Sequence, residues 1–216
     1  MNRLGGALVL FAAALLCAAA PRVGDAKEDT PVIVAFGDSL IAGLGLPESE
    51  SFPAKLEAAL KARGKEVSVV NAGVSGDTSA AALKRLDWAL ADGASAIIVE
   101  LGGNDALQGI PPEGTKANLA KIIEAAQAKH LPVLLAGMEA PRNMGRDYTD
   151  AFHAIYPALA AQYGVLLYPF FLDGVALEDS LMQADGIHPN AKGVTKIVEQ
   201  IMPKVDELLA RVKPKD

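Results

Sequence analysis

The chain has 216 residues and a formal net charge of −6 at pH 7, and 51% of its residues are hydrophobic. This length is sufficient for one domain with a sizeable core, so folding needs neither disulfides nor a structural metal ion. An acidic chain without a long run of Lys or Arg cannot neutralise a phosphate backbone. We therefore expect no nucleic-acid partner.

The N-terminus has the layout of a secretory signal peptide, with Arg3, an apolar run over residues 4–20 and small residues up to Ala26. We expect cleavage near Ala26, which leaves residues 27–216 as a single periplasmic or secreted domain that does not insert stably into a membrane. Cys17 lies inside the leader, so the mature chain has no cysteine. An uncleaved anchor and a lipoprotein signal that uses Cys17 are the alternatives.

The remaining chain alternates apolar runs with segments of helical spacing. Apolar runs predict strands at residues 32–36, 67–70, 96–101, 133–136 and 165–168. Helical spacing predicts helices that occupy residues 52–63, 78–92, 119–126, 152–163 and 194–208, the last with a kink at Pro203. Strands of this continuous apolar type, separated by helices, indicate a parallel sheet that is covered on both faces. The predicted fold is a three-layer, doubly wound α/β sandwich with a five-stranded parallel sheet.

The first strand ends at Gly37-Asp38-Ser39-Leu40, directly before a helix. A hydroxyl at the carboxyl end of a parallel strand lies where α/β proteins bind ligands, and its backbone N–H can point at an anion. Ser39 is therefore the first candidate nucleophile. The alternative is that Ser39 only caps the next helix.

A general base is expected at His188, in the segment Asp185-Gly186-Ile187-His188-Pro189-Asn190. Pro189 disfavours helical geometry at His188, and Asp185 is close enough in the chain to orient the imidazole ring. Asp185 and Gly186 could instead form a turn that caps the last helix. Neither His130 nor His153 has an acidic partner in a loop, and no set of ligands has the spacing of a metal site.

Two hydrogen-bond donors follow the next two strands, at Gly73 and Asn104. A glycine lets a backbone N–H approach an oxyanion closely, and an asparagine side chain supplies a second donor. Because parallel strands share one carboxyl edge, we expect both residues to lie beside Ser39.

The segment from Leu107 to Gly114 leaves the Asn104 strand and is expected to pass beside a bound acyl group. It carries the apolar side chains of Leu107 and Ile110 and has glycine hinges at Gly109 and Gly114, and we predict that both apolar side chains contact substrate. The alternative is a plain connector whose prolines start the next helix.

Four blocks, in order, resemble those of the GDSL or SGNH hydrolases: Gly37-Asp38-Ser39-Leu40, Gly73, Gly103-Asn104-Asp105 and Asp185-Gly186-Ile187-His188. The resemblance implies a flavodoxin-like fold without a cofactor. It also implies roles: Ser39 as nucleophile, His188 as general base, Asp185 as its orienting partner, and an oxyanion hole of Ser39 N–H, Gly73 N–H and Asn104. Residues 75–79, 100–105 and 185–190 are similar to the branch with bacterial periplasmic acyl-CoA thioesterases, lysophospholipases and arylesterases.

The first hypothesis is a monomeric serine hydrolase whose partners are small acyl esters, thioesters or lysophospholipids. A carbohydrate O-acetylesterase and a non-catalytic lipid-binding protein are the alternatives. A binding protein has no need of a nucleophile, base and orienting acid together. The apolar side chains of Leu107, Ile110, Phe170 and Phe171 favour an acyl chain over a sugar.

Overall fold

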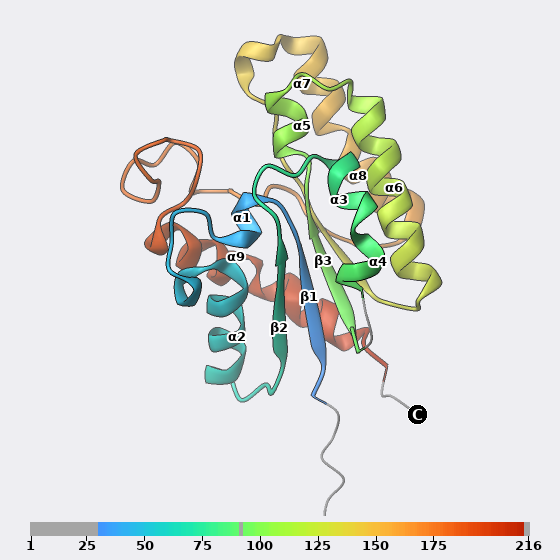
Figure 1. The fold of residues 1–216 in the computed structure, drawn as a ribbon, viewed down its shortest axis with the longest axis vertical. Coiled ribbons are helices and arrows are strands. Elements are labelled where there is room, and N and C mark those ends of the chain that lie inside the picture. Colours follow the sequence, from blue (N-terminus) through green and yellow to red (C-terminus); the bar gives the residue numbers. More distant parts are fainter. Residues whose placement is uncertain (1–29, 91–92, 214–216) are drawn as a thin grey trace, which may run out of the picture.

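The computed structural model describes residues 30–90 and 93–213, so the predicted signal peptide over residues 1–26 lies outside the described residues. Its described part is built on a five-stranded parallel sheet in the order β2-β1-β3-β4-β5 (Figure 1). The strands are β1 (Val32–Gly37), β2 (Ser68–Gly73), β3 (Ala96–Glu100), β4 (Val133–Ala136) and β5 (Leu166–Tyr168). This order and the parallel direction confirm the predicted doubly wound fold.

Helices follow the strands along the described chain. The α-helices are α1 (Ser39–Ala42), α2 (Phe52–Ala62), α3 (Ser79–Lys84), α4 (Leu86–Ala89), α5 (Gly103–Leu107), α6 (Pro112–Ala128), α7 (Arg146–His153), α8 (Ile155–Tyr163) and α9 (Ala191–Ala210). Two short 3₁₀ helices are η1 (Glu48–Glu50) and η2 (Arg142–Met144). In the part of the chain that the structure describes, no helix combines the length and apolarity needed to cross a membrane.

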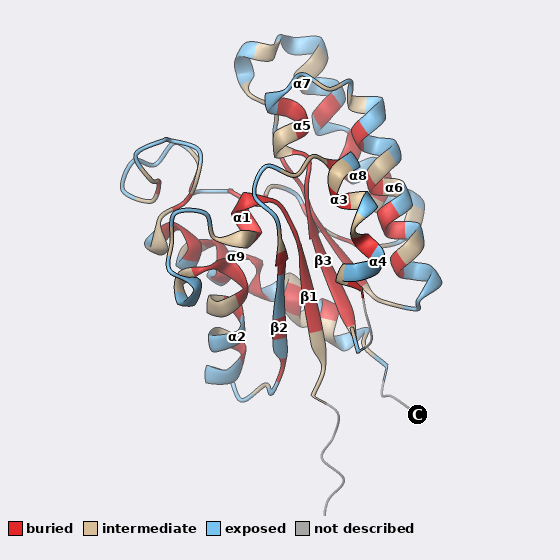
Figure 2. Cartoon of the chain, viewed as in Figure 1, coloured by how far each residue is buried: buried red, intermediate tan, exposed pale blue. Residues whose placement is uncertain are grey.

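The helices form a layer on each face of the sheet. In Figure 1, α2 and α9 cover one face, whereas α3, α4, α6 and α8 cover the other. Figure 2 shows the central strands buried between these layers, with exposed positions along the edge strand β2. Their continuous apolar sequences therefore fit strands that are covered on both faces.

Two predicted helices are each divided in the structure. The helix expected over residues 78–92 breaks at Arg85, which lies between α3 and α4 with φ −107° and ψ 5°. The helix expected over residues 152–163 breaks at Ala154, between α7 and α8. Pro157 explains the second break, because proline has no N–H to donate to the carbonyl of His153.

The carboxyl ends of β1, β2 and β3 meet at one edge of the sheet. Gly37, the last residue of β1, pairs in register with Gly73 of β2 and with Glu100 of β3. In the sheet, β2 lies on one side of β1 and β3 lies on the other. The strand order therefore reverses at β1, and open α/β sheets bind ligands at such a switch point. The predicted convergence of the loops after these strands is confirmed.

Candidate active site

Ser39 is the first residue of α1 and is almost buried, with 8% of its surface exposed. Asp38 fixes the start of this short helix, because its Oδ1 accepts a hydrogen bond of 3.0 Å from the Leu40 N–H. Gly43 ends the helix in the left-handed region, at φ 81°. Ser39 N–H therefore lies at a helix N-terminus, where N–H groups have no acceptor within the helix.

A hydrogen-bonded chain connects Ser39, His188 and Asp185. His188 Nε2 lies 2.9 Å from Ser39 Oγ, and His188 Nδ1 lies 2.7 Å from Asp185 Oδ2. The other carboxylate oxygen, Oδ1, accepts the backbone N–H groups of Ile187 at 2.9 Å and His188 at 3.0 Å. Ser39 and His188 are 149 residues apart in sequence, so the fold alone brings them together.

The charge on Asp185 determines which nitrogen of His188 carries the proton and therefore which way the hydrogen bonds of the chain run. The backbone N–H of His188, followed by its imidazole and the N–H of Ile187, holds the pKa of Asp185 well below its ordinary value. An ionised Asp185 selects the imidazole tautomer with the proton on Nδ1. Nε2 is then available to accept the Ser39 proton.

Asn104 lies in the first turn of α5 and points its amide toward the end of β1. Its Nδ2 donates to Asp38 Oδ2 and to the carbonyl O of Asp77, with both distances at 3.0 Å. An oxyanion therefore has to share or displace one of these acceptors to use this amide.

Gly73 ends β2 against the backbone of α1. A Cβ at this position would lie 2.8 Å from the carbonyl O of Asp38 and still closer to the backbone nitrogen of Ala42, so only glycine fits here. Its N–H donates to Asn71 Oδ1 at 3.1 Å. Gly73 thus lies beside the Ser39 turn. A substrate oxygen that accepts from its N–H has to replace Asn71 Oδ1 as the acceptor.

A cleft of about 870 Å³ opens at this edge of the sheet. Its walls include Ser39, Asn104, Leu107 and His188, all of which the sequence predicts as site residues. Further lining side chains are mostly apolar: Leu40, Met138, Ala140, Pro141, Phe170, Leu172, Ala176, Leu177, Met182 and Ile187. The cleft therefore joins a nucleophile and a base to an apolar surface.

The structure does not bring Ile110 to this cleft. Its carbonyl accepts a hydrogen bond of 2.7 Å from the Tyr148 hydroxyl, and its side chain faces Gly114 at the start of α6. Gly109, in the left-handed region at φ 64°, turns the chain between Leu107 and Ile110. Phe171, which the sequence also places near the site, packs in the core against Phe52 with ring centroids 5.1 Å apart.

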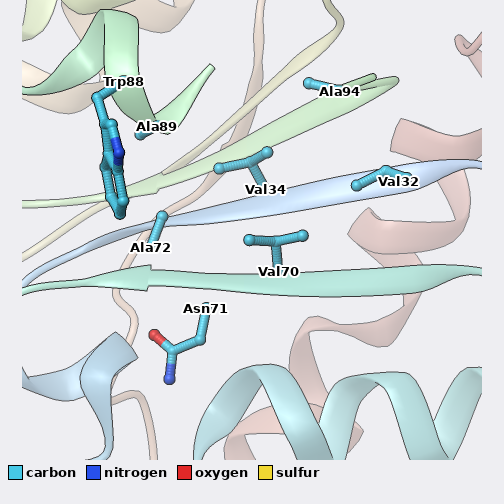
Figure 3. A pocket seen from close by; sticks show the side chains of 8 residues that line it. All are labelled: Val32, Val34, Val70, Asn71, Ala72, Trp88, Ala89 and Ala94. Carbon is cyan, nitrogen blue, oxygen red and sulfur yellow. The ribbon is translucent and has the colours of Figure 1, made fainter. Parts of the chain in front are cut away.

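A second cavity, of about 300 Å³, lies on the face of β1 and β2 beside Trp88 (Figure 3). Its lining residues are Val32, Val34, Val70, Asn71, Ala72, Trp88, Ala89 and Ala94. None of these side chains is a nucleophile or an acid or base that titrates near neutral pH. The cleft at Ser39 is thus the better candidate for chemistry.

Two buried carboxyl groups, those of Asp38 and Glu100, lie at the carboxyl ends of β1 and β3, and the sequence pattern predicts a role for neither. Burial is the main cause that raises the pKa of Asp38, and burial together with the Asp38 charge raises the pKa of Glu100 well above its ordinary value. Neither carboxyl oxygen of Glu100 has a hydrogen-bond partner among the described residues. The sequence signal for this group is a single acidic residue in the otherwise apolar run over residues 96–101.

Comparisons with known proteins agree with this geometry. The GDSL-like Lipase/Acylhydrolase family matches residues 35–196. Esterase TesA of Pseudomonas aeruginosa is 43% identical over 178 residues, which cover 82% of this chain and 89% of the relative. Thioesterase 1/protease 1/lysophospholipase L1 of Escherichia coli K12 is 40% identical over 185 residues, which cover 85% of this chain and 86% of the relative.

Solved structures show the same architecture. The crystal structure of TesA has a TM-score of 0.78 and 42% identity, and the match covers 82% of this chain and 99% of that one. The crystal structure of AlinE4, an SGNH-hydrolase family esterase, has a TM-score of 0.70 and 48% identity, with 83% and 97% of the two chains covered. The chain therefore belongs to the GDSL-like lipase/acylhydrolase family, the SGNH hydrolases.

Proposed function

We propose that this protein hydrolyses acyl esters and thioesters through a Ser39-His188-Asp185 triad and an acyl-enzyme intermediate. The observation that carries the proposal is the hydrogen-bonded chain from Ser39 Oγ to His188 Nε2 at 2.9 Å and from His188 Nδ1 to Asp185 at 2.7 Å. This arrangement supplies a nucleophile, a base and an orienting carboxylate in hydrogen-bond contact.

In the first half-reaction, Ser39 Oγ attacks the acyl carbonyl carbon while His188 Nε2 takes the hydroxyl proton. The carbonyl oxygen becomes an oxyanion, which the N–H groups of Ser39 and Gly73 and the amide of Asn104 stabilise. His188 then gives its proton to the departing alcohol or thiol. In the second half-reaction a water molecule, deprotonated by His188, hydrolyses the acyl-Ser39 ester and restores the free serine.

The cleft supports an acyl chain as the group that the protein recognises. Leu107, Phe170 and Leu177 are among its predominantly apolar walls, whereas a sugar needs polar groups that pair with its hydroxyls. The names of the relatives, an esterase and a thioesterase/lysophospholipase, support the same substrate classes. A carbohydrate O-acetylesterase is therefore the weaker candidate.

Hydrolysis rates across p-nitrophenyl esters of increasing chain length, together with an acyl-CoA and a lysophospholipid, test this proposal. We expect kcat/KM to rise from acetyl to longer acyl groups, and Ser39→Ala to abolish hydrolysis of every substrate. A preference for acetylated sugars, or equal rates with Ser39→Ala, would contradict it.

We further propose that residues 1–26 direct export and are removed, leaving a single hydrolase domain over residues 27–216 as a periplasmic or secreted monomer. The basis is the arrangement of Arg3, the apolar run over residues 4–20 and the small residues before Lys27. N-terminal sequencing of the exported protein and its mass in solution test both statements. A retained leader or a stable dimer would contradict them.

A further inference from the structure

Arg85, at the break between α3 and α4, makes three hydrogen bonds at the catalytic edge of the sheet. Its Nη2 donates to the carbonyl O of Gly37 and its Nη1 to the carbonyl O of Ala72, both at 2.8 Å. Its Nε donates to Asp77 Oδ2 at 2.6 Å. One guanidinium thus joins the end of β1, the end of β2 and the loop that follows β2.

Each of these three partners is connected to one donor of the proposed oxyanion hole. The Ala72 carbonyl belongs to the same peptide group as the Gly73 N–H, so fixing one fixes the other. Arg85 binds the side-chain carboxylate of Asp77, and the backbone carbonyl of the same residue accepts the hydrogen bond from Asn104 Nδ2 at 3.0 Å. Gly37 lies two residues before Ser39, at the point where β1 turns into α1.

The surroundings of Arg85 make these bonds strong and specific. Only 18% of the Arg85 side chain and 14% of the Asp77 side chain are exposed, so water screens their ion pair little. The guanidinium carbon also lies 4.4 Å from the centre of the Phe36 ring, within range of a cation–π interaction. A planar group with five N–H donors can bridge two carbonyls and a carboxylate, which a lysine ammonium cannot do in the same geometry.

We propose that Arg85 is the positioning residue of the oxyanion hole, holding the Gly73 peptide, the Asp77 carbonyl and the Ser39 turn in the arrangement that binds the transition state. The hydrogen bond to the Ala72 carbonyl also polarises its peptide group, which strengthens the Gly73 N–H as a donor. Arg85 touches no reacting atom, so its effect passes through Gly73, Asn104 and Ser39. This inference rests on the proposed serine-hydrolase function.

A double-mutant cycle with p-nitrophenyl butyrate tests the inference. We compare the wild type, Arg85→Ala, Asn104→Ala and the double variant, with Arg63→Ala as the matched control. Arg63 holds Asp206 through two hydrogen bonds, of 3.2 and 2.7 Å, and lies at the end of α2 away from the cleft. Thermal melts of each variant separate a lost fold from a lost rate.

We expect Arg85→Ala to lower kcat by about 10²-fold with KM nearly unchanged, because a loosened oxyanion hole weakens binding only in the transition state. In the Asn104→Ala background the further loss should be smaller than in the wild type, because the part of the effect that passes through Asn104 is already absent, whereas the parts that pass through Gly73 and Ser39 remain. Arg63→Ala should keep the wild-type kcat. An equal loss in both backgrounds, a change confined to KM, or a wild-type kcat in Arg85→Ala would overturn the proposal.

Two controls keep the result interpretable. If Arg85→Ala does not fold, Arg85→Lys is judged by the same comparison, because lysine keeps the charge that faces Asp77 and loses the bonds to both carbonyls. Hydrolysis by the wild type and its loss in Ser39→Ala test the proposed function separately. A Ser39-dependent rate that is insensitive to Arg85 rejects the positioning role alone.

Discussion

Replacing Asn104 by alanine removes an amide that donates to Asp38 Oδ2 and to the Asp77 carbonyl, each at 3.0 Å. If one of these N–H groups binds the oxyanion, its loss should lower kcat by about 10²- to 10³-fold, or roughly 2.7–4 kcal/mol of transition-state stabilisation. KM should change little, because the carbonyl oxygen becomes charged only as the reaction proceeds.

The same substitution has a separate cost in stability. Asp38 is 2% exposed, and without Asn104 its Oδ2 loses a hydrogen-bond donor. An unsatisfied buried acceptor costs about 1–3 kcal/mol, and each kcal/mol should lower the melting temperature by about 2–4 °C in a chain of this size. Steady-state kinetics and thermal melts on one preparation distinguish the two effects. A kcat within threefold of the wild type, or a raised KM alone, would refute the oxyanion role of Asn104.

Three further predictions concern other parts of the site. Asp185→Asn keeps an oxygen for the backbone N–H groups but presents an NH₂ group to His188 Nδ1, so kcat should fall by about 10²- to 10⁴-fold through the wrong tautomer. Circular dichroism should stay unchanged, and a near-wild-type kcat would contradict the triad. Leu177 lines the cleft, is 79% exposed and has φ 67°. Leu177→Gly should lower the octanoyl-to-acetyl ratio of kcat/KM by up to about fourfold for each substrate methylene that the leucine side chain covers. The control variant Trp88→Ala, outside the cleft, should leave this ratio unchanged. Equal ratios in both variants would contradict the role of Leu177. Burial, and then the Asp38 charge, raises the pKa of Glu100 well above its ordinary 4.5, so the folded chain keeps a proton that the unfolded chain releases and stability falls as the pH rises above that value. Glu100→Gln cannot ionise and should flatten the melting temperature between about pH 5 and 8; a slope equal to that of the wild type would contradict this account.

The sequence predicts the elements whose pattern is local. The strand at residues 133–136 coincides with β4, because its apolar run and its sheet pairing end together. The strand expected at residues 67–70 instead continues to Gly73 in β2, since pairing with β1 extends through Asn71. A polar residue is tolerated there because β2 is an edge strand, and no property of Asn71 alone reveals that position.

The site divides in the same way between local and long-range information. Asp185 and His188 lie in one turn, so their partnership can be predicted from spacing. Arg85 acts on carbonyls 13 and 48 residues away, and its helical surroundings suggest only a solvated side chain. The contact between Ile110 and substrate stays a prediction that the structure does not support, because Ile110 is not among the residues that line the cleft and its side chain lies near Gly114 of α6.

Mass mapping after reaction with a serine-directed fluorophosphonate tests the central claim most directly. The account predicts a single adduct on Ser39 in the wild type, because His188 Nε2 lies 2.9 Å from its Oγ and can take its proton. Labelling should disappear in Ser39→Ala and slow sharply in His188→Ala. An adduct on Ser75 or Ser79, or wild-type labelling without His188, would contradict the assignment of Ser39 as the nucleophile.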